Sequence, residues 1–246
     1  MSEYPAYQSP PQYPINYAIA RSPRVLSFVA IAALVGMIVL APVRSVEQVY
    51  SYHLLAAADR TLTDVRLAAV LSLGSLALTL VLSLFAAVTF ICWLYRVRTN
   101  TDAFGVQGLT WSPGWAIGCW FVPIGNLFIP MAVIGEIDRA SAGQAARVEN
   151  RPIDGRRLFV LWAVFWTLRW VAGFATFVGN FAIEGGTSAE RTHNAGLVAA
   201  LSFGAGAIDV AAAVIAILLV RRITANQERV LQAASIPMPY AQPAGF

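Results

Sequence analysis

The sequence predicts an all-α membrane protein, a polytopic bundle of four transmembrane helices with a re-entrant or proline-kinked hydrophobic hairpin. Of its 246 residues 58% are hydrophobic and only 12% are charged, and the mean hydropathy is +0.63. This composition is far from that of soluble domains. Four apolar segments are long enough to cross a bilayer, and arginines gather beside them in the pattern that sets membrane topology.

The predicted spans each approach or exceed the ~20 residues that a hydrocarbon core of ~30 Å requires. They cover about 25–43, 67–95, 158–183 and 196–220, and together they define a helical membrane domain over 25–222. The apolar run of the first span leads into Pro42 and Arg44 instead of a cleavage site, so we expect an uncleaved anchor. Residues 1–24 are rich in Pro and Tyr and predict a disordered tail, and 223–246 predict a second tail.

The segment between the first two spans has the pattern of an amphipathic helix. Apolar and small side chains recur three and four positions apart over about 46–65, which places them on one helical face. We expect this linker helix to lie on the membrane surface or to cap the bundle.

The stretch WFVPIGNLFIP, Trp120 to Pro130, interrupts the remaining apolar segment, which covers about 113–137. Pro123 and Pro130 each lack a backbone donor, and Gly125 and Asn126 between them favour a turn. We therefore expect a hairpin that enters the membrane and returns, enclosed by the four spans. The alternative is a proline-kinked fifth transmembrane helix.

The distribution of arginine favours the hairpin. Every basic residue is Arg, and none is Lys. With a hairpin, one side of the membrane carries twelve arginines and the other side four, whereas a fifth crossing divides the arginines outside the spans eleven to five. The positive-inside rule prefers the first arrangement. It places the protein in the cytoplasmic (inner) membrane with both termini in the cytoplasm.

The segments WLYRVRTNTDAFG and SPGWAIGCWFVPIGNLFIPMAVIGEIDRAS resemble the core signature of a bacterial membrane protein family catalogued as domain of unknown function 4328, frequent in actinobacteria. The resemblance covers Trp93 to Ser141 most clearly. The sequence departs from the family pattern at Asp138, where a tryptophan is usual, and over 131–135, which is more apolar than usual. The resemblance implies a membrane location and a shared motif, and it implies no reaction.

Two ionisable residues lie inside the predicted spans, Arg169 and Asp209. Each is twelve residues, or ~18 Å of helix, from an arginine at the same membrane edge, on consecutive antiparallel spans. Because a charge at mid-membrane costs about 2.5–3.5 kcal/mol on insertion scales, we predict that they form a buried ion pair. Alternative roles are part of an ion or proton path, or a site for an anionic headgroup.

A cytoplasmic-face motif is predicted at Arg96 and Asn100 after the second span, and at Glu136 and Arg139 after the hairpin. Arg98, Asp138, Arg156 and Arg157 lie nearby in the same regions. Acidic and basic side chains there could connect the inner face, and arginines beside the bilayer attract anionic lipid headgroups.

The sequence predicts no enzyme, no cofactor and no metal site. Cys92 and Cys119 lack a partner ligand at metal-binding spacing, and neither a nucleophile motif nor a phosphate-binding glycine loop occurs. Basic and aromatic residues are not interleaved on a soluble face, which argues against nucleic acid. We expect a scaffold or accessory subunit that contacts lipid and other membrane proteins. The alternative is a small channel or transporter whose path the hairpin lines.

Overall fold

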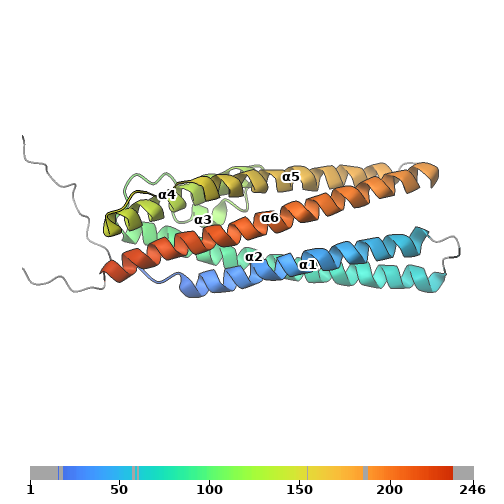
Figure 1. Ribbon diagram of the computed structural model, residues 1–246, viewed down its shortest axis with the longest axis horizontal. Coiled ribbons are helices and arrows are strands. Elements are labelled where there is room, and N and C mark those ends of the chain that lie inside the picture. The colour runs from blue at the N-terminus through green and yellow to red at the C-terminus, as the bar shows by residue number, and fades with distance from the viewer. Residues whose placement is uncertain are drawn as a thin grey trace, which may run out of the picture.

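The computed structural model consists of four long helices packed in a row, with shorter helices gathered at one end (Figure 1). It describes residues 16, 19–56, 59, 61–153, 155–184 and 188–234, with side chains for all of these except 48, 51–56, 179–184 and 188–199. The long helices are α1 (Arg24–Ala56), α2 (Leu62–Ala103), α5 (Arg157–Glu184) and α6 (Ser188–Ala234). The shorter ones are α3 (Trp115–Gly118), η1 (Gly125–Leu127) and α4 (Ile129–Glu149).

The predicted all-helical fold with four candidate spans is confirmed. Each long helix contains an apolar window able to cross a membrane, and the described residues contain no strand. In Figure 1, α2 ends and α5 begins at the same end of the row. Residues 104–156 therefore leave and rejoin the bundle on one side.

The helices lie in the order α2, α1, α6, α5, because α1 packs on both α2 and α6, and α5 packs on α6. Within the spans most large apolar side chains point away from the protein; Val171 and Phe174 of α5, for example, are 61% and 69% exposed. Such side chains are stable in contact with lipid, which is as apolar as they are. The membrane part is thus held by contacts between neighbouring helices of the row.

One end of the row is packed like a soluble domain, and we call it the arginine-rich end. It comprises the last turns of α2 and α6, helix α4, and residues 104–128. Its core includes Trp93, Leu94, Val97, Ile134, Ile137 and Ile223, all fully buried. Where this end extends beyond the bilayer into water, each Å² of buried apolar surface stabilises the fold by ~25 cal/mol.

The separate linker helix predicted over 46–65 does not form. Helix α1 continues through Pro42 to Ala56, and α2 begins at Leu62, where Thr61 and Asp64 make a capping box. The predicted amphipathic face is therefore divided between extensions of two spans. Ser72 and Ser75 of α2 donate hydrogen bonds of 2.8 and 3.1 Å to Glu47, which ties the extension of α1 to the α2 span.

The tails predicted over 1–24 and 223–246 are partly ordered. Helix α6 runs to Ala234, and Ile223, Gln227 and Val230 on its extension are at most 1% exposed. Before α1, the backbone N–H of Arg21 donates to Oδ1 of Asn100 at 3.1 Å. These segments are ordered because they cover the core of the arginine-rich end. The rest of the predicted tails, 1–15, 17–18 and 235–246, lies outside the described residues.

The fold predicts which engineered cysteines share a side of the membrane. In a background with both native cysteines replaced by alanine, a cysteine at Gly143 should react with an impermeant thiol reagent from the same side as one at Arg157. A cysteine at Asp59 should react from the opposite side. Gly143 suits the test because a Cβ there meets no atom within 4 Å. Labelling of Gly143 and Asp59 from one side would contradict the fold.

Candidate functional site

A buried amide pair organises the arginine-rich end. Gln227 of α6 donates from Nε2 to the carbonyl of Val97 at 2.8 Å and to Oγ of Ser141 at 3.1 Å. Its Oε1 accepts from Nδ2 of Asn100 at 2.9 Å. Asn100 also donates to the carbonyl of Arg21 at 2.8 Å. Because both amides are fully buried, their hydrogen bonds hold α2, α4, α6 and the segment before α1 in one arrangement.

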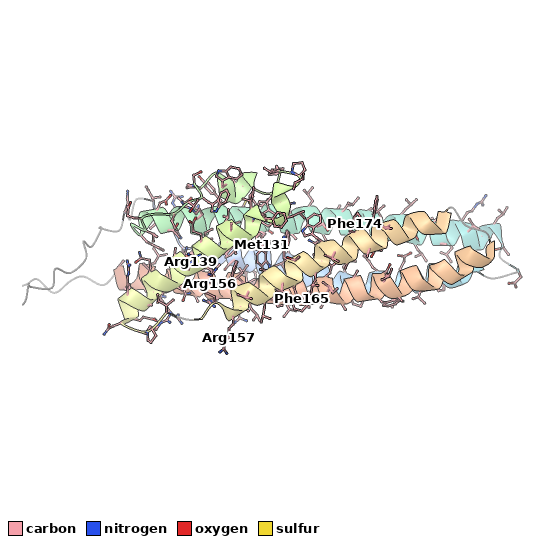
Figure 2. The ribbon with its side chains drawn as sticks, turned by 90° about the horizontal axis from the view of Figure 1, so that it is seen from above. Met131, Arg139, Arg156, Arg157, Phe165 and Phe174 are labelled. Carbon is pink, nitrogen blue, oxygen red and sulfur yellow. The ribbon has the colours of Figure 1, made fainter. Side chains whose placement is uncertain are left out.

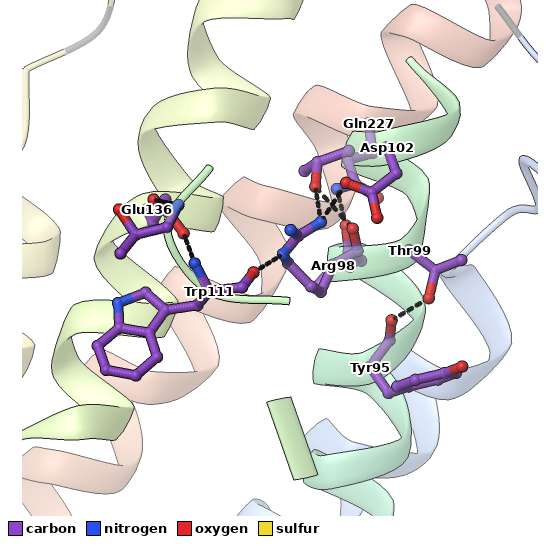
Figure 3. Close-up of polar contacts among 10 residues, drawn as sticks. Tyr95, Arg98, Thr99, Asp102, Trp111, Glu136 and Gln227 are labelled. Carbon is purple, nitrogen blue, oxygen red and sulfur yellow. Dashed lines mark hydrogen bonds and ion pairs between the residues drawn. The ribbon is translucent and has the colours of Figure 1, made fainter. Parts of the chain in front are cut away.

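A second set of contacts fixes the start of the hairpin segment (Figure 3). Arg98 of α2, only 3% exposed, donates from Nε to the carbonyl of Trp111 at 2.7 Å and pairs with Asp102 at 2.5 Å. On the other side, Glu136 of α4 accepts from the backbone N–H groups of Thr110 and Trp111 at 2.6 and 3.1 Å. The backbone of Trp111 is therefore held between Arg98 of α2 and Glu136 of α4.

An ion pair joins α4 to α6. Asp138 is 1% exposed, and its Oδ1 lies 3.3 Å from Nε of Arg222. Arg222 also donates to the carbonyl of Gly155 at 2.8 Å, just before α5. A buried carboxylate needs such a partner, since an unpaired charge at this position would be strongly destabilising. The contacts position the α4–α5 connection.

The predicted cytoplasmic-face motif divides into two groups. Asn100 and Glu136 belong to the networks above. Arg96 is half-buried and Arg139 is exposed, and Figure 2 places Arg139 on the outer side of α4. Arg96 precedes Arg98 by two positions, which on a helix points it to a different side. Gln227 was missed because the last helix was predicted to end near 220, although 223, 227 and 230 have the three-and-four spacing of a buried face.

The hairpin motif packs an aromatic cluster against two spans. The ring of Trp120 makes edge contacts with Phe90 of α2 and Trp166 of α5, at centroid distances of 5.8 and 5.7 Å. Its Nε1 donates to the carbonyl of Ala116 at 3.1 Å. Trp166 in turn stacks on Trp162 at 5.6 Å. The cluster connects α2 and α5, the two ends of the helix row, through residues 115–128.

The turn between Pro123 and Pro130 lies where the sequence places it, but its second arm differs. Gly125 is required, because a Cβ there would lie 2.7 Å from side-chain atoms of Val122 and Ile129. The N–H of Asn126 donates to the carbonyl of Val122 at 2.7 Å. Pro130 occupies the first turn of α4, where its missing donor costs nothing. It therefore starts a helix of 21 residues and does not break one.

The outer surface of this turn is apolar. Phe121, Ile124 and Phe128 are 73%, 77% and 62% exposed, and Figure 2 shows side chains projecting outward from this part of the chain. In water such a cluster would be an unfavourable apolar patch.

The Oδ1 atom of Asn126 and the Nε1 atom of Trp166 are buried without a hydrogen-bond partner.

The structure brings Arg169 and Asp209 together, with Nε and Oδ1 2.8 Å apart. The guanidinium also lies 5.7 Å from the ring centroid of Trp166. The prediction that the pair is buried is wrong, since the two side chains remain 48% and 52% exposed. They lie on the outer face of α5 and α6 because no third span packs over that face in the helix row.

A shallow recess of about 190 Å³ surrounds this pair. It is lined by Arg169, Trp170, Gly173, Ala205 and Asp209. Gly173 and Ala205 are small enough to let another backbone approach closely.

The described contacts at these sites are hydrogen bonds, ion pairs and aromatic contacts. Within the described ranges, no cluster of three or more His, Cys, Asp or Glu side chains could hold a metal ion. Cys92 is exposed and Cys119 is buried, and both are free thiols.

Residues 56–225 match the protein family described as Domain of unknown function (DUF4328). This match covers more than half of the chain. It includes Asn100, the hairpin motif and the pair of Arg169 and Asp209, and it ends before Gln227. No curated protein and no solved structure matches the chain.

Replacement of Gln227 by leucine should destabilise the arginine-rich end. The change removes the bonds that Gln227 makes to Asn100, Val97 and Ser141. Nδ2 of Asn100 then keeps only its bond to the carbonyl of Arg21, and an unmet hydrogen bond of a buried group costs roughly 1–3 kcal/mol. Unfolding of purified protein in mixed detergent micelles, followed by circular dichroism, measures the loss. Gln107→Leu, at an exposed position, is the matched control and should change stability little. Equal stability of both variants would show that the network contributes nothing.

Proposed function

The chain belongs to the DUF4328 family, and we propose that it is a non-enzymatic membrane scaffold that assembles through the outer face of α5 and α6. The observation that carries this proposal is the half-exposed ion pair of Arg169 and Asp209, which joins two candidate membrane spans. Lipid tails offer no hydrogen bonds or counter-charges to the exposed atoms of this pair. A protein surface with its own charges satisfies them better than lipid does.

A second copy of the chain is the partner that the charges favour. Under two-fold symmetry, the same patch meets itself, so Arg169 of each copy approaches Asp209 of the other. The recess at Gly173 and Ala205 allows the close backbone approach that membrane helix pairs use. Trp170 of α5, which lines the recess and is exposed, adds apolar surface to this face. Other membrane proteins could then be organised around the assembled pair.

We also propose that the arginine-rich end faces the cytoplasm of a bacterial inner membrane and that residues 115–128 re-enter the bilayer from that side. The positive-inside rule supports the orientation. The exposed Phe121, Ile124 and Phe128 support the re-entry, since their side chains are stabilised by contact with acyl chains. The short helices and the turn leave few backbone groups to be satisfied within the membrane.

A disulfide experiment tests assembly. Gly173→Cys, in a background with Cys92→Ala and Cys119→Ala, should form a disulfide-linked dimer on mild oxidation in membranes. A Cβ at Gly173 meets nothing within 4 Å in the monomer. Gly74→Cys on α2, where a Cβ is equally unobstructed, is the matched control and should remain monomeric.

The ion pair itself is tested in the same assay. Asp209→Leu alone should reduce the yield of folded protein, because it leaves a charged Arg169 in the membrane. The double variant Arg169→Leu with Asp209→Leu should fold but lose the Gly173 cross-link. Assembly through this face would be refuted if folded protein with Arg169 and Asp209 intact shows no cross-link at Gly173, or if Gly74→Cys cross-links equally.

A small channel or transporter is the second candidate, and the tip of the hairpin favours it. The unpartnered Oδ1 of Asn126 and Nε1 of Trp166 are polar atoms among apolar side chains. Such atoms can be satisfied by water, as a permeation path would provide. A scaffold does not require that water reach these atoms from the side opposite the arginine-rich end.

Accessibility of the tip separates the two candidates. In a transporter, Asn126→Cys should react with an impermeant thiol reagent added from either side of the membrane. In a scaffold, it should not react from the side opposite the arginine-rich end. A cysteine at the exposed Asp59 provides the positive control for reagent added from that opposite side. Reaction of both cysteines from that side would favour transport.

A further inference from the structure

A cleft between α1 and α6 lies at the arginine-rich end, apart from the amide network, the hairpin and the ion pair. Its volume is about 520 Å³. Three arginines line it together with one glutamate and several small or polar side chains. The lining residues used below are Arg24, Phe28, Ile31, Arg221, Ala225 and Glu228.

The cationic groups of the cleft are only partly neutralised. Arg24 pairs with Glu228, with Nε and Oε2 2.8 Å apart, and Glu228 also accepts from the hydroxyl of Ser22. Arg229, which also lines the cleft, pairs with Glu149 at 3.3 Å. The only carboxylate in the lining is therefore already engaged. Arg221 is exposed, and its guanidinium adds a further positive charge.

The apolar and charged side chains of the cleft lie at similar heights along the two helices. The helices are antiparallel, and the Arg24–Glu228 contact sets their register. Phe28 and Ile31 are one and two turns along α1 from Arg24, toward the middle of the span. Arg221 is seven residues, or ~10 Å, along α6 from Glu228 in the same direction. A group of positive charge thus adjoins Phe28, whose side chain is 74% exposed.

We propose that this cleft binds an anionic phospholipid, with its phosphate between Arg24 and Arg221 and an acyl chain along Phe28 and Ile31. Guanidinium groups bind phosphate oxygens through charge-assisted hydrogen bonds. Basic pockets between membrane helices suit lipid headgroups for this reason. A free phosphate would contact only the charged side chains of the cleft. The adjoining apolar side chains identify a lipid as the ligand.

Native mass spectrometry of the full chain in detergent, titrated with phosphatidylglycerol or phosphatidylcholine, tests the proposal. Phosphatidylglycerol should bind more tightly. Arg221→Gln should weaken its binding about fivefold, the effect of about 1 kcal/mol for one arginine near the membrane surface. Arg157→Gln is the matched control, since Arg157 lies at the start of α5 and points away from the bundle in Figure 2. The Arg157→Gln variant should bind phosphatidylglycerol as tightly as the unaltered protein does.

Two further arms distinguish the ligand source and protect against misfolding. Ala225→Glu adds a carboxylate at an exposed position of the cleft without removing any contact, and it should weaken phosphatidylglycerol binding while circular dichroism stays unchanged. Inorganic phosphate in excess should not displace the lipid. The proposal is overturned if phosphate displaces it, if Arg157→Gln weakens binding as much as Arg221→Gln, or if Ala225→Glu has no effect.

Discussion

The hydrogen bonds between Gln227 and Asn100 are the interaction on which the arrangement of the arginine-rich end depends. Both side chains are fully buried, so each of their polar atoms needs a partner inside the protein. Those partners come from α2, α4 and the residues before α1. A buried amide with unmet hydrogen bonds is costly, so few alternative packings of these segments are available. This constraint keeps α6 helical beyond its apolar stretch.

Two kinds of stabilisation act along the same helices. At the arginine-rich end, fully buried Trp93, Ile137 and Ile223 make a core resembling that of a soluble domain. Farther along the spans, large side chains such as Val171 and Phe174 point outward, where lipid replaces a protein core. The first region has one well-specified packing, while the second presents broad faces to the bilayer. An assembly surface is therefore best sought on the spans.

The polar groups that point away from the protein core identify where outside molecules are needed. Arg169 and Asp209 satisfy each other yet remain half-exposed on a lipid-facing surface. Arg221 adjoins exposed Phe28 across a cleft. In water, either feature would be an ordinary solvated charge. Beside a bilayer, the cost of an unmet charge rises steeply with depth. On this ground we propose a protein partner for the first feature and a lipid phosphate for the second.

Much of this protein follows from its sequence alone. The four spans follow because an apolar run of about 20 residues in a bilayer must satisfy its backbone within a helix. The pairing of Arg169 with Asp209 follows from equal depth on consecutive antiparallel helices, and the turn at Gly125 follows from its neighbouring prolines. Tertiary structure decided the rest. Hydropathy does not mark how far a helix extends beyond the membrane, so α6 proved longer than predicted. The burial of Arg98 in place of Arg96, and the exposure of the ion pair, depend on which helices become neighbours, and those contacts join residues far apart in the chain.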